Sequence, residues 1–421
     1  MYQEQILENG LNVLMVPMSH VQSISVGIFV RVGSRYEPKS KAGISHFIEH
    51  MLFKGTACRP TAKQIAETIE GIGGISDAYT NQETTVYYAR VAASQANVAI
   101  DFLADLVRNP LFQPAEIEKE RQVIGEELDM IYDAPDDWVE ILLDQLLWPN
   151  HPLGQNIAGT QRSLAGIDQE ALISFFQKSY HPHNLVVAVA GAFEPERVTS
   201  ELARHLGDWQ PRPVPKFKPA PAAQTEPRCY IEHRSIEQGH LCLALPGLAR
   251  SHPQRYALNV LNTLLGDGMS SRLFLKLRED RGLAYAVDSG LNFLQDTGCL
   301  VIYAGVDPER ASEALQVILD ELARLRDEPI PPEELRKAKE YLKGRLVLAL
   351  EDSYSQASWV AHQKLFMDTI KSPDEVLAAY DAVTVSDVKA VAEKIIDPVG
   401  YSLAAVGPFS QGSALAKQVT G

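Results

Sequence analysis

Cysteine is scarce in this chain, and its scarcity excludes one broad class of protein. Four cysteines lie among 421 residues, and no two of them form a Cys-x-x-Cys pair. A chain of this length with so few cysteines does not rest on a disulfide framework, so we expect free thiols. Long apolar runs are also absent, because no stretch approaches the roughly 20 apolar residues that a membrane-spanning helix needs. We therefore expect a globular protein without a membrane partner.

Positive charge is in short supply as well. The chain has 39 lysine and arginine residues against 54 aspartate and glutamate residues, a net charge of −15. This balance disfavours nucleic acid and anionic membranes as partners, and it favours neutral or cationic peptides. The alternative, which the charge supports equally, is that acidity only keeps the protein in solution.

The first residues contain no recognisable targeting signal. The run MYQEQILENGLNVLMVP has neither the basic start nor the long apolar stretch of a secretory signal. It is also too acidic for a mitochondrial transit peptide. We expect a cytoplasmic protein, unless a leader was removed before this sequence begins.

The most informative segment is His46-Phe47-Ile48-Glu49-His50, which has the pattern H-x-x-E-H. This is the reverse of the usual zinc-protease order and is the inverzincin motif. Histidines four residues apart lie on one face of a helix, where both imidazoles can bind one Zn²⁺ ion. Glu49 falls at the edge of that face, so it could hold a water molecule without binding the metal.

A polar surface stripe or a chance match would explain the same letters. The flanking residues argue against both, since they make the helix apolar nearly all round: Ile44, Phe47, Ile48, Met51, Leu52 and Phe53. Such a helix should be buried, and Gly55 is placed to end it. Buried histidine and glutamate side chains need polar partners, which a bound metal would supply.

A third protein ligand is expected from residues 114–131, which contain five glutamates. On a helical wheel the apolar residues of this segment form a stripe that should be buried: Ile117, Ile124, Leu128 and Ile131. Glu120 and Glu127 lie beside this stripe, whereas Glu118 and Glu126 suit an exposed face. Glu127 is therefore the better ligand, and Glu120 could orient a histidine.

Two runs carry a resemblance to a known family: AGISHFIEHMLFKGT (42–56) and ERQVIGEELDM (120–130). They resemble the pitrilysin/insulinase class of zinc peptidases, and most of all its short branch, which is similar to the mitochondrial processing peptidase. The resemblance implies a metalloprotease that binds one Zn²⁺ per chain through His46, His50 and Glu127. It places the catalytic base on Glu49 and a supporting glutamate on Glu120.

The resemblance also implies how a peptide is bound. Residues 75–91 are predicted to form a hairpin, because a β-branched and aromatic run follows Gly73 and Gly74. If 75–80 is an edge strand, its free backbone groups could pair with an extended substrate. The family uses this edge, so Asp77 and Ala78 correspond to substrate main-chain contacts. Relatives usually carry asparagine in place of Asp77, and an ionised aspartate accepts hydrogen bonds but cannot donate them.

Arg278 and Tyr285 correspond to a pair, seven positions apart, that related peptidases place over the zinc site. By residue type alone they belong to a charged helix end and a partly buried tyrosine, with Gly282 as the C-cap. The resemblance implies that they stabilise the tetrahedral intermediate and the substrate carbonyl. Arg281 is the rival for the cationic role.

A proline-rich segment, residues 210–227, divides the chain near its middle and should be an extended linker. The halves show the same order of predicted elements. In the first half we expect strands near 11–17, 24–32, 75–91 and 185–191, and helices near 42–54, 61–71, 95–108 and 114–133. In the second half we expect strands near 228–234, 239–245, 284–305 and 401–406, and helices near 253–265 and 270–281, then from 308 and from 331.

The predicted fold is therefore α+β, with two homologous domains that enclose a chamber. Each domain should have helices packed on a mostly antiparallel sheet. Residues 1–209 would form the catalytic, zinc-binding domain. Residues 228–421, which lack the motif, would form an inactive domain that contributes substrate contacts.

The predicted function is that of a zinc-dependent endopeptidase acting on peptides or unfolded polypeptide segments, working as a homodimer. The alternative is a non-catalytic or partner-dependent subunit of a heterodimeric complex similar to a processing peptidase. A metal-binding module without hydrolysis is a third possibility.

Overall fold

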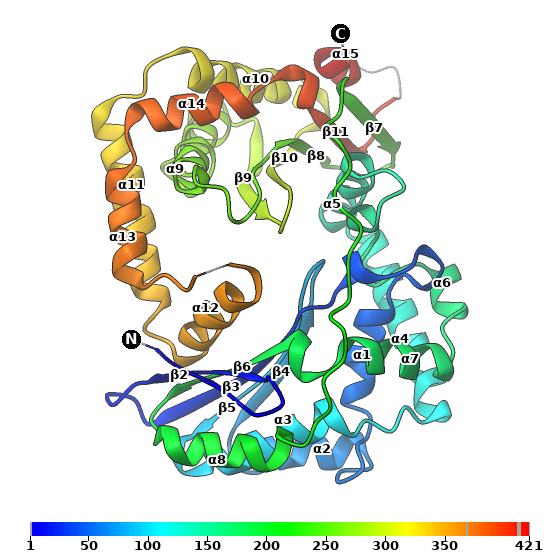
Figure 1. Ribbon diagram of the computed structural model, residues 1–421. Helices are drawn as coiled ribbons and strands as arrows, with labels where there is room; N and C mark the ends of the chain where they lie inside the picture. Colours follow the sequence, from blue (N-terminus) through cyan, green and yellow to red (C-terminus); the bar gives the residue numbers. More distant parts are fainter. Residues whose placement is uncertain (1, 368, 411–413, 421) are drawn as a thin grey trace. The chain divides into compact units, whose positions relative to one another are not determined.

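The computed structural model describes residues 2–367, 369–410 and 414–420. These residues pack as two compact units. The first unit comprises Met1–Asp129, Gln155–Lys218 and Leu348–Lys371, and the second comprises Met130–Gly154, Pro219–Val347 and Ser372–Gly421. Each unit contains one β-sheet and its own helices (Figure 1).

The first unit is built on a six-stranded sheet. Its strands, in spatial order, are β1 (Gln3–Ile6), β2 (Asn12–Pro17), β6 (Leu185–Gly191), β3 (Ser23–Val30), β5 (Thr85–Ala92) and β4 (Ile75–Thr80). Neighbours are antiparallel except for β2 and β6. All seven residues of β6 are buried, as expected for a strand that is covered on both faces.

The second unit has a five-stranded sheet with the same plan. Its strands, in spatial order, are β7 (Arg228–His233), β11 (Ser402–Gly407), β8 (Gly239–Pro246), β10 (Gly298–Val306) and β9 (Ala284–Phe293). Only β7 and β11 are parallel. This order repeats that of the first sheet without β1, so the predicted internal duplication and the α+β fold class are confirmed.

The helices cover these sheets. The first half of the chain forms α1 (Ile44–Leu52), α2 (Ala62–Glu70), α3 (Ala96–Arg108), α4 (Pro114–Asp133), α5 (Pro135–Leu147), α6 (Gln161–Ala165), α7 (Gln169–Ser179) and α8 (Pro195–Leu206). The second half forms α9 (Arg255–Leu265), the π-helix η6 (Phe274–Glu279), α10 (Ala311–Asp327), α11 (Pro332–Ala349), α12 (Ser353–Phe366), α13 (Pro373–Ala382), α14 (Val385–Ile395) and α15 (Ala414–Thr420). In the described part of the chain, no helix has both the length and the apolar character needed to cross a bilayer.

Two helices pack away from their own half of the sequence. Helix α12 lies on the first sheet, where Ala357, Val360 and Leu365 join a core with strand residues such as Phe29 (Figure 1). Helix α5 packs on the second sheet through apolar side chains that include Val139. The predicted division at 1–209 and 228–421 follows the order of the chain, whereas the compact units exchange these two segments.

The proline-rich segment 210–227 contains neither helix nor strand. It is nevertheless anchored in the first unit by one aromatic side chain. The Phe217 ring lies 3.9 Å from the Arg35 guanidinium carbon and packs edge-on against Tyr36. The anchor fixes the path of this part of the linker over the first unit.

Candidate metal centre

Helix α1, which carries the H-x-x-E-H motif, begins at a glycine that the geometry requires. Gly43 has a φ of +93°, and a Cβ there would lie 2.6 Å from the carbonyl oxygen of Ala158. The buried Glu37 carboxylate accepts hydrogen bonds from the backbone N–H groups of Gly43 and Ser45 at 2.7 and 2.8 Å. It therefore satisfies donors at the start of the helix that would otherwise be unpaired. Burial raises the pKa of Glu37 to about 7.

His46 and His50 lie on one side of α1 with their ring nitrogens together. Their Nε2 atoms are 3.3 Å apart. The side chains are 18% and 17% exposed, while the apolar residues of α1 face the core. The predicted burial of this helix is therefore correct, and the pair of nitrogens lies at its accessible edge.

Glu127 approaches the same point from α4. Its Oε2 atom lies 3.8 Å from His46 Nε2 and 3.7 Å from His50 Nε2. The burial of α4 largely follows the helical wheel, because Ile117, Ile124 and Leu128 are buried. Glu126 is exposed as expected, whereas Ile131, expected in the buried stripe, is only half-buried. The helix therefore presents Glu127 to the histidines.

The three atoms fit a zinc ion. A tetrahedral site with zinc–ligand bonds of about 2.0–2.2 Å has ligand–ligand separations of roughly 3.3–3.6 Å. The separations of 3.3, 3.7 and 3.8 Å are close to this range. Within the described ranges, His46, His50 and Glu127 form the one group of three or more such side chains that could hold a metal.

Glu120 lies where it can set the orientation of His50. Its Oε2 atom is 3.1 Å from His50 Nδ1, and its Oε1 atom is 2.8 Å from Lys54 Nζ. When Nδ1 donates to this carboxylate, the lone pair of His50 lies on Nε2, where a metal would bind. Burial by itself would raise the pKa of Glu120, but the hydrogen bonds from His50 and Lys54 lower it below its ordinary value.

His46 is held in its neutral form. Burial, with a smaller effect of the nearby His50, lowers the pKa of His46 to about 4. A neutral imidazole keeps the lone pair that a metal ligand needs. Its Nδ1 atom is buried and has no hydrogen-bond partner among the residues that the structure describes.

Glu49 is adjacent to the ligands but is not one of them. Its Oε2 atom accepts a hydrogen bond of 2.5 Å from the hydroxyl of Thr80, the last residue of β4. Burial raises the pKa of Glu49 above its ordinary value. The side chain therefore has the place expected of a base beside a metal site.

Strand β4, next to Glu49, is an edge strand of the first sheet, as predicted. Asp77 is exposed on it, and Ile75 is 60% exposed. The N–H of Ala78 donates to the Asp77 side chain, with Oδ1 at 2.8 Å. The edge is thus available to an extended peptide, and one of its N–H groups is occupied by a local side chain.

Arg278 and Tyr285 lie in the second unit. The Arg278 guanidinium carbon is 5.7 Å from the centre of the Tyr285 ring, which belongs to a side chain 78% exposed. Arg281 forms an ion pair with Glu313 at 3.8 Å, whereas Arg278 has no carboxylate partner in the described residues. Arg278 is therefore the better placed of the two arginines to bind an external negative charge.

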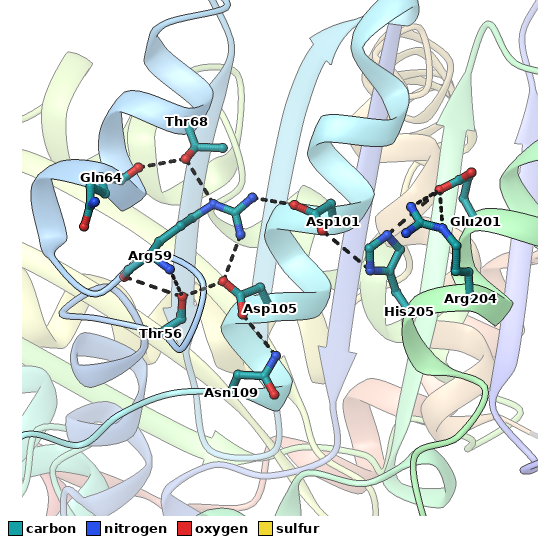
Figure 2. Close-up of polar contacts among 10 residues, drawn as sticks. All are labelled: Thr56, Arg59, Gln64, Thr68, Asp101, Asp105, Asn109, Glu201, Arg204 and His205. Atoms are coloured by element: carbon teal, nitrogen blue, oxygen red, sulfur yellow. Dashed lines mark hydrogen bonds and ion pairs between the residues drawn. The ribbon is translucent and has the colours of Figure 1, made fainter.

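The helices that carry the candidate ligands, α1 and α4, are linked through the segments at one end of each. The loop after α1 pairs with the segment between α3 and α4, through Gly55 O with Leu111 N at 3.0 Å and Ala57 N with Asn109 O at 2.9 Å. Figure 2 shows the side chains that fix this loop to α3, in which Asp105 accepts from Thr56 and Arg59 at 2.5 and 2.8 Å. This network fixes the loop after α1 to the end of α3 and to the segment that leads into α4.

Three contacts around the site were not predicted from the sequence. Thr80 contacts Glu49 and Lys54 contacts Glu120, whereas Glu37 binds the backbone at the start of α1. Lys54 follows His50 by four residues, so its helical spacing could have drawn attention to it. Thr80 and Glu37 contact α1 only in the folded structure, and no local sequence pattern indicates either contact.

Comparison with protein families gives two matches that together span most of the chain. Residues 13–161 match the insulinase family (peptidase family M16), and residues 166–342 match the peptidase M16 inactive domain. The chain is 36% identical to the uncharacterised zinc protease YmxG of Bacillus subtilis, over 95% of this chain and 97% of that protein. It is 37% identical to an uncharacterised zinc protease of Mycobacterium leprae, over 98% and 93%.

Solved structures with the same fold cover nearly the whole chain. A protease from Helicobacter pylori matches with a TM-score of 0.92 and 25% identity, over 97% of this chain and 99% of that one. A peptidase M16 inactive domain from Pseudomonas fluorescens matches with a TM-score of 0.90 and 21% identity, over 97% and 98%. These structures show the same fold. The full-length relatives establish that the chain belongs to the insulinase family of peptidases, family M16.

Proposed function

We propose that this protein is a zinc-dependent endopeptidase that hydrolyses peptides or unfolded polypeptide segments. One observation carries the proposal: His46, His50 and Glu127 offer ligand atoms within 4.8 Å of one another. Glu49, the neighbour of His50 on α1, lies outside this group and interacts electrostatically with His50 and Glu127. The full-length relatives named as zinc proteases support it.

The residues divide into metal ligands, a supporting group and a base. Bound zinc would supply a Lewis acid that polarises the scissile carbonyl and lowers the pKa of the attacking water. Glu120 orients His50, and Glu49 accepts the proton of the attacking water and later delivers it to the leaving amine. The raised pKa of Glu49 suits this task, because it brings the carboxyl group closer to neutral pH.

Substrate binding is proposed at the edge of β4. An extended peptide would pair with the backbone there, with Asp77 and Ala78 in contact with its main chain. Pairing at Ala78 would replace the local hydrogen bond from its N–H to Asp77. Arg278 and Tyr285 are proposed, from the family resemblance, to stabilise the negative charge of the tetrahedral intermediate.

A peptide library tests this function. The purified chain should cleave peptides, lose the activity with a chelator, and recover it when zinc is added back. Glu49→Gln should abolish turnover yet leave one zinc bound per chain, because Glu49 is not a ligand. Full activity of this variant would refute the proposed mechanism.

Zinc binding without cleavage would instead favour the partner-dependent or non-catalytic subunit. Light scattering then separates a homodimer, which we propose, from a monomer that lacks its related partner. A protein that binds zinc but cleaves nothing with any partner would be a metal-binding module. Fractionation of cells tests the proposed cytoplasmic location independently.

A further inference from the structure

The hydrogen bond between Thr80 and Glu49 joins an edge strand to the proposed base. Thr80 lies at the end of β4, and Glu49 lies on α1. The Thr80 Oγ1 atom is 2.5 Å from Glu49 Oε2. Among the described residues, the other carboxylate oxygen of Glu49 forms no hydrogen bond or ion pair. One oxygen is thus held by the strand, and the other is left for a reactant.

The proton of this hydrogen bond can be assigned from the neighbouring groups. A hydroxyl has one proton to donate, and a carboxylate can only accept. Thr85 Oγ1 lies 3.3 Å from Thr80 Oγ1, but it donates to the carbonyl oxygen of Val32 at 3.0 Å. The proton of Thr80 therefore goes to Glu49, whose negative charge makes it the stronger acceptor.

The backbone of Thr80 is itself fixed. Thr80 pairs with Thr85 in the β4–β5 ladder. In the intervening turn, the Asn81 side chain accepts from the N–H groups of Glu83 and Thr84 at 2.8 and 2.7 Å. Asn81 N–H also donates to Thr84 O at 2.8 Å. The hydroxyl that holds Glu49 is thus presented by a closed turn, and its position does not depend on a long side chain.

We propose that Thr80 is a positioning residue for the general base. Its hydroxyl holds Glu49 Oε2 against the strand, so that Oε1 faces the attacking water. This inference rests on the proposed function. The same residue terminates the strand that would pair with substrate, so it fixes the base relative to the peptide backbone as well as to the metal.

The second unit contains a polar contact between the corresponding helix and edge strand. Helix α9 follows β8 as α1 follows β3, and β9 lies at the sheet edge as β4 does. There, Ser289 Oγ donates to Asn262 Oδ1 at 2.7 Å, and Asn262 Nδ2 donates to Ser289 O at 3.2 Å. Both ends of the Asn262 amide are used, so this contact only joins helix to strand. The Glu49 contact leaves one oxygen unused.

The test compares three single variants of the full chain in peptide hydrolysis. Thr80→Val removes the hydroxyl at nearly constant volume and should lower kcat about 10- to 100-fold, with KM and zinc content little changed. Thr80→Ser keeps the hydroxyl and should restore most of kcat. Ser289→Ala is the matched control, because it breaks the corresponding contact in the second unit and should lower the melting temperature while leaving kcat near that of the wild type.

The results that would overturn the proposal are equally specific. A Thr80→Val enzyme with kcat within about twofold of the wild type refutes it, as does a Thr80→Ser enzyme as impaired as Thr80→Val. Equal losses of kcat in Thr80→Val and Ser289→Ala would assign Thr80 a structural role only.

A second measurement is independent of activity. Thr80→Val, Glu49→Ala and the double variant are melted as metal-free proteins. If the two side chains are bonded, the shifts in melting temperature should not be additive. Additive shifts would overturn the contact itself. A wild-type protein that binds zinc but cleaves no peptide would overturn the proposed function, a result distinct from additive shifts in this cycle.

Discussion

Replacing Glu120 by glutamine should weaken zinc binding although Glu120 is not a proposed ligand. Glu120 is 5% exposed, and its carboxylate lies 3.1 Å from His50 Nδ1 and 2.8 Å from Lys54 Nζ. A glutamine side chain can accept from only one of these donors through its oxygen, and its NH₂ group would face the other. His50 would then lose a charged partner that fixes its orientation.

The expected size of the effect follows from two estimates. Hydrogen bonds to charged groups contribute roughly 1.5–3 kcal/mol and neutral ones about 0.5–1.5 kcal/mol, so the exchange removes about 1–1.5 kcal/mol at His50. Loss of a group that orients a metal-binding histidine typically weakens metal affinity about 10- to 100-fold. The first estimate corresponds to about tenfold, at the lower end of this range. We therefore expect the zinc Kd to rise by about tenfold or more.

Competition with a chromophoric chelator would measure this Kd. Glu126→Gln is the matched control, because Glu126 lies on the same helix but is exposed. It removes the same charge and should leave the Kd unchanged within about twofold. An unchanged Kd in Glu120→Gln, or equal losses in both variants, would refute the argument that Glu120 acts through His50.

Three further predictions concern the metal and the stability of the fold. Glu127→Ala should reduce bound zinc from one ion per chain to almost none at micromolar zinc concentrations. Metal analysis of the purified variant would measure this, and retention of the ion would exclude Glu127 as a ligand. Because burial raises the pKa of Glu37 from 4.5 to about 7, the folded state binds a proton that the unfolded chain has released. Stability of the metal-free protein should therefore fall by up to about 3 kcal/mol between pH 4.5 and 7.5, and Glu37→Gln should flatten that slope in urea unfolding. Asp105→Ala should lower stability by about 2–4 kcal/mol, because it leaves the partly buried Arg59 without one of its carboxylates. Glu67→Ala, in an exposed pair, should change stability by less than about 0.5 kcal/mol, and equal effects would contradict this reasoning.

The sequence was sufficient to predict the repeated α+β plan because most of the pattern is local. Strand β3 and the hairpin of β4 and β5 lie close to their predicted ranges, since alternating and β-branched runs mark strands directly. The segment 270–281 was expected to be a helix, and its middle, Phe274–Glu279, is a π-helix. Whether a helical segment forms i→i+4 or i→i+5 hydrogen bonds depends on the packing around it, which the sequence pattern does not specify.

The partners of two helices could not be predicted. An apolar face indicates that a helix is buried, but it does not indicate which sheet the helix packs against. Val139 and Leu143 of α5 contact the second sheet, and Ala357 and Val360 of α12 contact the first. These pairings join residues that are far apart in the chain, so only the folded structure reveals them.

The candidate site likewise has a part that the sequence predicts and a part that only the structure shows. His46, His50 and Glu127 follow from helical spacing, because each helix places its own side chains on a known face. The helical wheel also indicated Glu120, which meets His50 across 70 positions of sequence. Thr80 reaches Glu49 across 31 positions, and no local pattern indicates that contact. Contacts over such distances are set by the packing of α1 against β4 and α4.

Helices α5 and α12 each pack on the sheet of the other half, and this affects how the protein folds during synthesis on the ribosome. Domains usually fold in the order in which they are synthesised. Here the face of the first sheet that contains Phe29 and Val86 is covered by α12, whose residues are made only after β7 to β10. Until α12 emerges, the nascent first half carries an uncovered apolar surface. The half of the chain that contains the candidate metal site therefore completes its core only when most of the other half has already been translated.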